Sequence, residues 1–137
     1  MMIVDTSALL AYFDANEPAH RRIADVIDAA SEPLVVSPYV VAELDYLLLT
    51  RHGTRAEQLV LDELAGGAWD LADFGPTRLR AAASIVRNYR DVPIGVTDAS
   101  LVVLAAEMRT DRVVTLDRRH FSALRLPGGG PIRILPD

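Results

Sequence analysis

Residues 2–13 read MIVDTSALLAYF, a short apolar run that ends in an aspartate and passes into a longer, mostly apolar stretch. The run Met2–Val4 predicts a buried strand, because apolar residues follow one another without a polar break. Thr6 or Ser7 can cap the helix that we expect next. Asp5 therefore stands between a strand and a helix, where ligand-binding side chains are often found in α/β proteins.

The rest of the chain repeats this alternation of short apolar strands with helices. Further strands are expected at 34–36, 69–74, 112–116 and 132–135. Helices are expected from about residue 16, at 38–53, from 54 to about 66, at 76–88 and at 98–108. The alternation favours an α/β fold with a mainly parallel sheet. Parallel strands end at the same edge of a sheet, so Asp5 and Asp117, which both follow apolar strands, should lie at that edge.

Three helix starts carry capping patterns. Ser37 precedes Pro38, and proline is favoured at the first helical position. Thr54 and Glu57 have the spacing of a capping box. Thr97 can cap the helix at 98–108. These patterns predict where the helices begin.

Composition restricts the classes of protein and of chemistry. The chain has 137 residues, 50% of them hydrophobic and 24% charged, which predicts one globular domain over residues 1–137. It has no cysteine, so disulfides, thiolate metal sites and cysteine nucleophiles are excluded. All 14 basic residues are arginine, which excludes a Walker phosphate loop and Schiff-base chemistry, since both need lysine. We find no leader-like or membrane-spanning stretch and expect a cytoplasmic protein.

Four acidic residues are candidates for a site that is both catalytic and metal-binding: Asp5, Glu43, Asp98 and Asp117. Taken singly, each aspartate has a structural explanation as a turn or helix cap. Glu43 is different, because it lies within the strongly apolar stretch PYVVAELDYLLL and should be exposed, paired or bound to a metal. Like charges brought together would repel one another, and a hard cation with oxygen ligands, Mg²⁺ or Mn²⁺, resolves that repulsion.

Such a cation suggests phosphodiester chemistry. It polarises a phosphoryl oxygen and lowers the pKa of bound water, so the expected reaction is attack of water on a phosphodiester. The net charge of −5 argues against a broad basic surface for nucleic acid, but not against a contact bridged by a metal. The hydroxyls of Thr6, Ser7 and Thr115 can orient ligands or water, although capping or strand filling explains each of them singly.

At these residues the sequence resembles the PIN domain family, and within it the VapC toxins of bacterial toxin–antitoxin pairs. The matching motifs, in an order that spans nearly the whole chain, are IVDTSALLAYF at 3–13, SPYVVAEL at 37–44, VTDASLVVLAAE at 96–107 and VVTLDRRHF at 113–121. The resemblance implies a three-layer α/β/α sandwich around a parallel sheet. It also implies a metal-dependent ribonuclease whose acidic cluster maps to Asp5, Glu43, Asp98 and Asp117.

The same resemblance implies partners and a biological role. It implies a homodimer, a cognate VapB-type antitoxin that blocks the active site, and a heterotetramer or larger assembly with that antitoxin. It implies growth inhibition through cleavage of transfer or ribosomal RNA. Among the acids, Asp5 and Asp98 are the firmest expected metal ligands. Glu43 is a ligand or a water-positioning base, and Asp117 acts through water or in a second metal site.

Several residues near the acids are left open by the sequence. Asp91 is an extra acid before the Asp98 helix, and nothing in the sequence says whether it joins the site. Arg118 and Arg119 either contact RNA phosphates or form surface ion pairs. His120 is interpreted as structural, with proton transfer as the alternative. The aromatic and leucine side chains of the first and third helices are interpreted mainly as core, with a dimer or antitoxin groove as the alternative, namely Tyr12, Phe13, Tyr46 and Leu47–Leu49.

Two other functions compete with the ribonuclease. One is a non-catalytic RNA-binding or scaffold domain of the same fold, which would show no metal binding that depends on the acids. The other is a phosphotransfer enzyme with Asp5 as nucleophile. Two observations argue against the phosphotransfer enzyme: no second aspartate stands two residues after Asp5, and no lysine is present to bind the transferred phosphate.

Overall fold

The computed structural model describes residues 1–137 as five short strands and seven helices. The strands are β1 (Met2–Val4), β2 (Leu34–Val36), β3 (Asp70–Leu71), β4 (Arg112–Val114) and β5 (Arg133–Leu135). The helices are α1 (Thr6–Phe13), α2 (His20–Asp28), α3 (Pro38–His52), α4 (Thr54–Ala65), α5 (Pro76–Asn88), α6 (Val96–Glu107) and α7 (Arg118–Ala123). None of these helices is long and apolar enough to cross a membrane.

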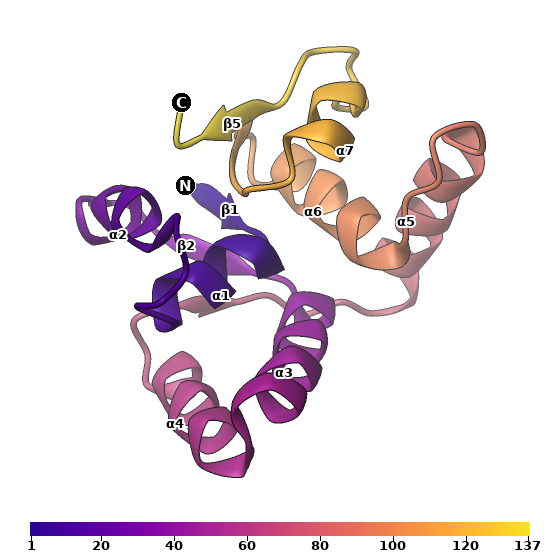
Figure 1. The fold of residues 1–137 in the computed structure, drawn as a ribbon. Helices are drawn as coiled ribbons and strands as arrows, with labels where there is room; N and C mark the ends of the chain where they lie inside the picture. The colour runs from indigo at the N-terminus through magenta and orange to yellow at the C-terminus, as the bar shows by residue number, and fades with distance from the viewer.

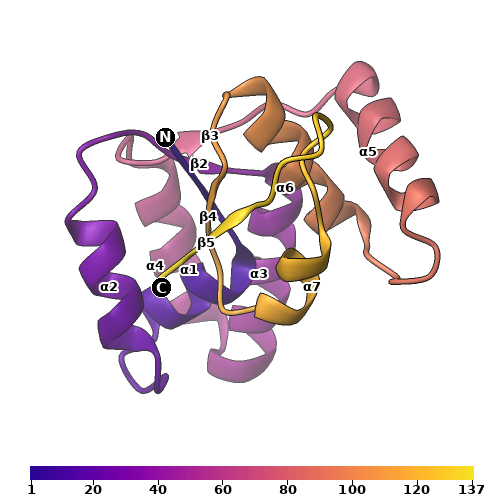
Figure 2. The same ribbon diagram turned by 90° about the horizontal axis from the view of Figure 1, so that it is seen from above.

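The strands form one parallel sheet in the order β3-β2-β1-β4-β5. β1 lies at the centre and pairs in parallel with both β2 and β4, while β3 and β5 extend the two sides, again in parallel. In Figure 1 helices α1 to α4 lie below and to the left of the strands, and α5 to α7 lie to the upper right. The view from above in Figure 2 shows the strands running through the middle of the molecule. The α/β fold with a parallel sheet and flanking helices is confirmed.

Helix α6 is the most deeply buried helix. It packs against β1 and β4 on one side and against α5 on another. All seven residues from Ala99 to Ala105 are buried, which is the pattern of a helix covered on all sides. The buried hydroxyls of Ser37 and Ser100 lie 2.8 Å apart and join the start of α3 to the start of α6. The first turns of these two helices are thereby fixed beside the carboxyl ends of β1 and β2.

Most predicted elements are confirmed, but three capping assignments are wrong. Only Ser37 caps as expected, accepting a hydrogen bond from the Tyr39 N–H at 3.2 Å. The helix after β1 is preceded by Asp5, so Thr6 and Ser7 lie inside its first turn. Gly53, with φ of 90°, ends α3 and begins α4 at once, which leaves no capping position for Thr54. Helix α6 begins at Val96, so Thr97 also lies inside the helix.

Element lengths differ from the prediction near the sheet edges. β3 has only two residues, because it pairs on one side only and the chain leaves the sheet directly after Leu71. β4 ends at Val114 instead of residue 116. α2 begins at His20, later than predicted. Helix α7 was not predicted, since its six residues are too few for an apolar period to be recognised.

Candidate active site

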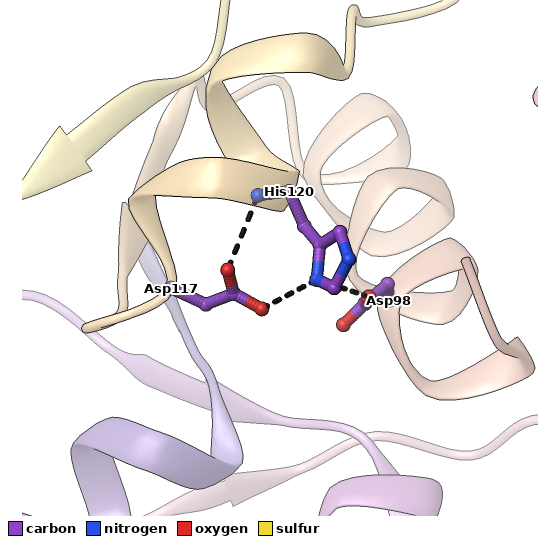
Figure 3. Close-up of side chains that lie close together, drawn as sticks. All are labelled: Asp98, Asp117 and His120. Atoms are coloured by element: carbon purple, nitrogen blue, oxygen red, sulfur yellow. Dashed lines mark hydrogen bonds and ion pairs between the residues drawn. The ribbon is translucent and has the colours of Figure 1, made fainter. Parts of the chain in front are cut away.

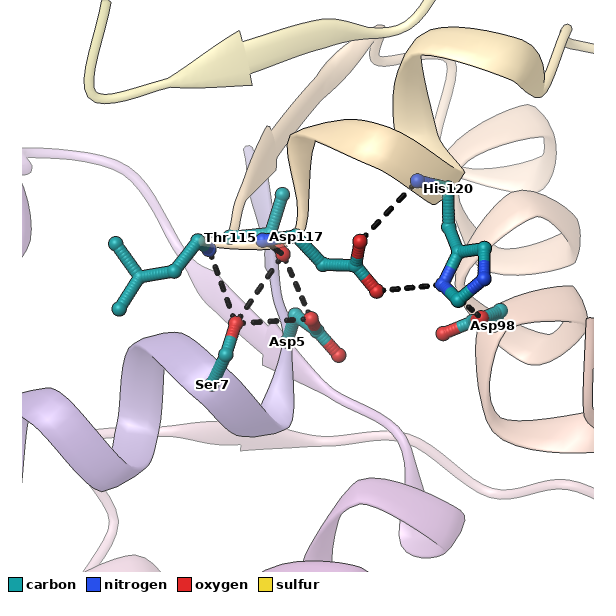
Figure 4. Close-up of polar contacts among 7 residues, drawn as sticks. Asp5, Ser7, Asp98, Thr115, Asp117 and His120 are labelled. Atoms are coloured by element: carbon teal, nitrogen blue, oxygen red, sulfur yellow. Dashed lines mark hydrogen bonds and ion pairs between the residues drawn. The ribbon is translucent and has the colours of Figure 1, made fainter.

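Asp5 lies directly after β1 and is buried, with 5% of its surface exposed. Its Oδ2 accepts hydrogen bonds from the Thr115 hydroxyl at 2.7 Å and from the Ser7 hydroxyl at 3.1 Å, as Figure 4 shows. Its Oδ1 accepts no side-chain hydrogen bond. Burial raises the pKa of Asp5 above its ordinary value, although hydrogen bonds from the Thr115 hydroxyl, the Thr6 backbone N–H and the Ser7 hydroxyl oppose the rise. One carboxylate oxygen is thus fixed by the protein and the other is available to a ligand.

Asp98 lies in the first turn of α6. Its side chain is 20% exposed. Burial raises its pKa to about 6, and the negative charges of Asp5, Asp117 and Glu43 add to the rise, whereas His120 lowers it. A carboxyl group that responds to three other acids must lie in a strongly negative environment.

Asp117 caps the short helix α7 and also faces the site. Its Oδ1 accepts a hydrogen bond from the His120 backbone N–H at 3.1 Å. Its Oδ2 lies 2.7 Å from His120 Nδ1, and the same nitrogen lies 3.9 Å from Asp98 Oδ2. Figure 3 shows the imidazole ring between the two carboxylates. One donor atom from each of Asp98, Asp117 and His120 lies within 4.8 Å of the others, which is compact enough to hold a metal ion.

Glu43 reaches the same region from α3. Its side chain is exposed, as its apolar context required of an unpaired carboxylate. Its charge raises the pKa of both Asp5 and Asp98. Asp45, two residues on, does not take part. It is half-buried and forms a hydrogen bond with Glu57 that raises the pKa of that group. The structure therefore brings Glu43 toward the three aspartates, although Glu43 lies outside the compact group around His120.

The charged residues left open by the sequence are now placed, whereas the core interpretation is wrong for Tyr46 and Leu49, which are 66% and 41% exposed. Asp91 is exposed in the loop between α5 and α6 and is not among the charges that shift the pKa of Asp98. Arg118 donates a hydrogen bond to the Pro136 carbonyl, and exposed Arg119 makes no ion pair or hydrogen bond. The prediction understated His120, which contacts the site directly. Its spacing of three residues from Asp117 was the available signal, because residues three apart share one face of a helix.

The predicted hydroxyls divide into two groups. Ser7 and Thr115 orient Asp5, and they also lie 3.2 Å from each other. The backbone N–H groups of Leu116 and Asp117 donate to these two hydroxyls, which ties the network to the segment after β4. The Thr6 hydroxyl, by contrast, is buried without a protein partner. The support of Asp5 therefore comes from both α1 and the end of β4.

Comparison with known proteins gives the family. The PIN domain model matches residues 2–125. The chain is 59% identical to ribonuclease VapC26 of Mycobacterium tuberculosis over 135 residues, which covers 98% of this chain and 100% of VapC26.

Solved structures agree on the fold. VapC20 of Mycobacterium tuberculosis, a toxin that cleaves the sarcin–ricin loop, superposes with a TM-score of 0.81 at 16% identity and covers 87% of this chain and 92% of its own. The DNA-bound VapBC complex of Salmonella typhimurium contains a chain with a TM-score of 0.69 at 17% identity, covering 97% of this chain and 96% of that one. The fold, the order of the motifs and the overall sequence identity all indicate the same family. The chain belongs to the PIN domain family, as a ribonuclease toxin of the VapC type.

Proposed function

We propose that residues 1–137 form one endoribonuclease domain that works with Mg²⁺ or Mn²⁺ held by Asp5, Glu43, Asp98 and Asp117. One observation carries the proposal. Four acids from four separate segments lie so close together that three of them raise the pKa of the fourth, Asp98. Proteins seldom leave such repulsion uncompensated, and a divalent cation compensates it directly.

The residues fit a hard cation. Carboxylate oxygens are the ligands that Mg²⁺ and Mn²⁺ prefer. Asp5 offers Oδ1 while Thr115 and Ser7 hold its Oδ2, an arrangement that fixes a ligand in advance. Asp98 would be the second direct ligand. Glu43 would bind the cation or orient a water, and Asp117 would act through water or in a second metal site.

The chemistry divides between the cation and the side chains. A bound divalent cation lowers the pKa of its water and polarises a phosphoryl oxygen. Glu43 is exposed to solvent and its charge acts on Asp98, so Glu43 would be the group that accepts a proton from an attacking water. Asp98, with a pKa of about 6, is mostly ionised at neutral pH but keeps its proton below about pH 6 in the metal-free protein, and a bound cation would favour the ionised form to lower pH.

The substrate that we propose is a structured RNA, either transfer or ribosomal RNA. Arg119 supports this, because it is exposed, two residues from Asp117, and free of any acidic partner. Arg118 is tied to the Pro136 carbonyl and would take a phosphate only after exchange of that bond. With the net charge of −5, these arginines beside the acids give the RNA backbone a local rather than a broad attachment.

The test is cleavage of purified transfer and ribosomal RNA with Mg²⁺ or Mn²⁺, with cleavage sites mapped by sequencing. Asp5→Ala and Asp98→Asn should abolish cleavage, whereas Asp91→Asn, at an exposed acid of the α5–α6 loop, should cleave as the parent does. Full activity in either of the first two variants would refute the assignment of the acids. Absence of metal-dependent cleavage by the parent would favour the non-catalytic alternative.

We further propose that a VapB-type antitoxin binds the toxin and that the toxin forms homodimers in the cytoplasm. A cavity of about 410 Å³ between the end of α1 and the helices α3 and α4 supports an antitoxin contact, since Phe13, Leu48 and Leu59 line it. Leu59 is 59% exposed and therefore offers apolar surface to a partner at this groove. An amphipathic helix of the antitoxin fits such a groove. Light scattering of the toxin alone and with its antitoxin gives the assembly sizes.

A further inference from the structure

His120 is the side chain near the acids that the proposed metal site does not use. It lies on α7, three residues after Asp117, and its side chain is 37% exposed. The other two histidines are engaged elsewhere, His20 with the Ala11 carbonyl at 2.7 Å and His52 with Asp14 at 3.1 Å. Only His120 faces two acids of the site at once.

We infer that His120 binds the cation through Nδ1 and thereby makes the site prefer Mn²⁺ to Mg²⁺. The inference rests on the proposed metal-dependent function. Ligands at about 2.1 Å from an octahedral cation lie about 3.0 Å apart when adjacent and about 4.2 Å apart when opposite. Nδ1 lies 2.7 Å from Asp117 Oδ2 and 3.9 Å from Asp98 Oδ2. Small shifts would place all three atoms around one ion.

The bonding of Asp117 points the same way. Its Oδ1 is occupied by the His120 backbone N–H, so its Oδ2 is the oxygen that faces the ring. A histidine that served only to orient Asp117 would have no need to approach Asp98 as well. The ring instead lies between the carboxylates of Asp98 and Asp117 (Figure 3), and its Nδ1 is within 3.9 Å of an oxygen of each. Buried Phe121 anchors α7 next to His120 and limits how far the ring can move away.

The chemical consequence concerns which ion is selected. Mg²⁺ binds oxygen almost exclusively in proteins and keeps several waters. An imidazole nitrogen raises affinity for first-row transition ions relative to Mg²⁺. A site with three or four carboxylates and one imidazole should therefore bind Mn²⁺ more tightly than an all-oxygen site would. Removal of the imidazole should lower Mn²⁺ affinity more than Mg²⁺ affinity.

Pulsed electron paramagnetic resonance of the Mn²⁺-loaded protein tests the inference without an activity assay. We expect a nitrogen hyperfine coupling from a directly bound imidazole. When histidine alone is labelled with ¹⁵N, the ¹⁴N coupling should be replaced by a ¹⁵N coupling. His120→Asn should remove the coupling, because asparagine can keep an N–H donor toward Asp117 but offers no imidazole nitrogen. His52→Asn, remote from the site, is the matched control and should keep it. Calorimetry should show Mn²⁺ affinity lowered about 10-fold or more in His120→Asn.

Three outcomes are distinguishable. The coupling in the parent and its loss in His120→Asn would support the inference. Mn²⁺ binding that depends on Asp98 but shows no nitrogen coupling would overturn the inference and leave the proposed function standing. No Asp98-dependent Mn²⁺ binding would overturn both.

Discussion

Replacing Asp98 with asparagine should stabilise the metal-free protein at neutral pH. Most substitutions near a site destabilise, so this is a demanding expectation. Its reason is that the folded chain must hold the Asp98 carboxylate in a partly buried place beside Asp5, Asp117 and Glu43. Asparagine has nearly the same shape and no charge. The side chain accepts no hydrogen bond from the protein that the amide would forfeit.

The size of the effect follows from the pKa. A rise from 3.8 to about 6 corresponds to about 3 kcal/mol at most. The side chain is 20% exposed, and screening by solvent reduces the figure to about 1–2 kcal/mol. Asparagine also forgoes the favourable interaction of a carboxylate with the first turn of α6, about 0.5 kcal/mol. A net gain of about 1 kcal/mol remains, which is about 3 °C in Tm for a chain of this length.

The pH dependence gives the sharper test. Between pH 4 and 6 the folded protein binds the Asp98 proton more tightly than the unfolded chain does, so the stability contributed by this group falls as pH rises through about that window. Below it both states are protonated, and above it the penalty is constant. The advantage of Asp98→Asn should therefore be near zero at low pH and full at neutral pH.

Urea unfolding at several pH values in the presence of a chelator measures this advantage. Asp91→Asn, which removes an exposed acid outside the cluster, is the control and should show no such pH dependence. Addition of Mn²⁺ should reverse the order, because the parent gains binding energy and Asp98→Asn gains little. An advantage that is absent at neutral pH, or equal at both ends of the pH range, would refute the account of Asp98 as an uncompensated charge.

Three further predictions concern the support of the site and its partner surface. Thr115→Val removes the shorter hydrogen bond to Asp5 and should weaken Mn²⁺ binding by about 10-fold in calorimetry, with Ser7→Ala smaller in effect because its bond is longer. Phe121→Ala should lower the free energy of unfolding by about 3–5 kcal/mol in urea, since the ring is fully buried; a loss below 1 kcal/mol would show that α7 is not anchored by it. Leu59→Glu should weaken antitoxin binding by about 10-fold or more in a titration and leave RNA cleavage unchanged, because Leu59 lines the groove and not the acidic cluster.

The sequence predicted the centre of the fold better than its margins. Strands β1 and β2 are short apolar runs buried on both faces. Such a run can be recognised as a strand from sequence even though apolar and polar residues do not alternate in it. Strand β3 was harder, because a two-residue edge strand is defined by its partner β2 rather than by its own residues. Trp69 and Phe74 suggested a longer strand, yet both belong to aromatic clusters outside it, Trp69 with Tyr12 and Phe74 with Tyr39.

Capping failed where two signals competed at one position. Thr54 and Glu57 have the spacing of a capping box, but the left-handed Gly53 directly before them already ends one helix and starts the next. A pattern of residues cannot show that a single glycine serves both helices. The Thr97 assignment failed differently, because α6 begins at Val96, one residue before the expected cap, and Gly95 precedes the helix without a side-chain cap.

Asp117 shows why single residues of the site were hard to assign from sequence. The structural explanation, that it caps a turn, is correct, since its Oδ1 accepts the His120 N–H. The functional prediction is compatible with it, because a carboxylate has a second oxygen, and Oδ2 faces the cluster. Asp5 is built alike, with Oδ2 held by hydroxyls and Oδ1 without a side-chain donor. In both residues the structural bond to one carboxylate oxygen fixes the direction of the other oxygen. The structural and the functional explanation of each aspartate therefore apply to different oxygens of the same carboxylate.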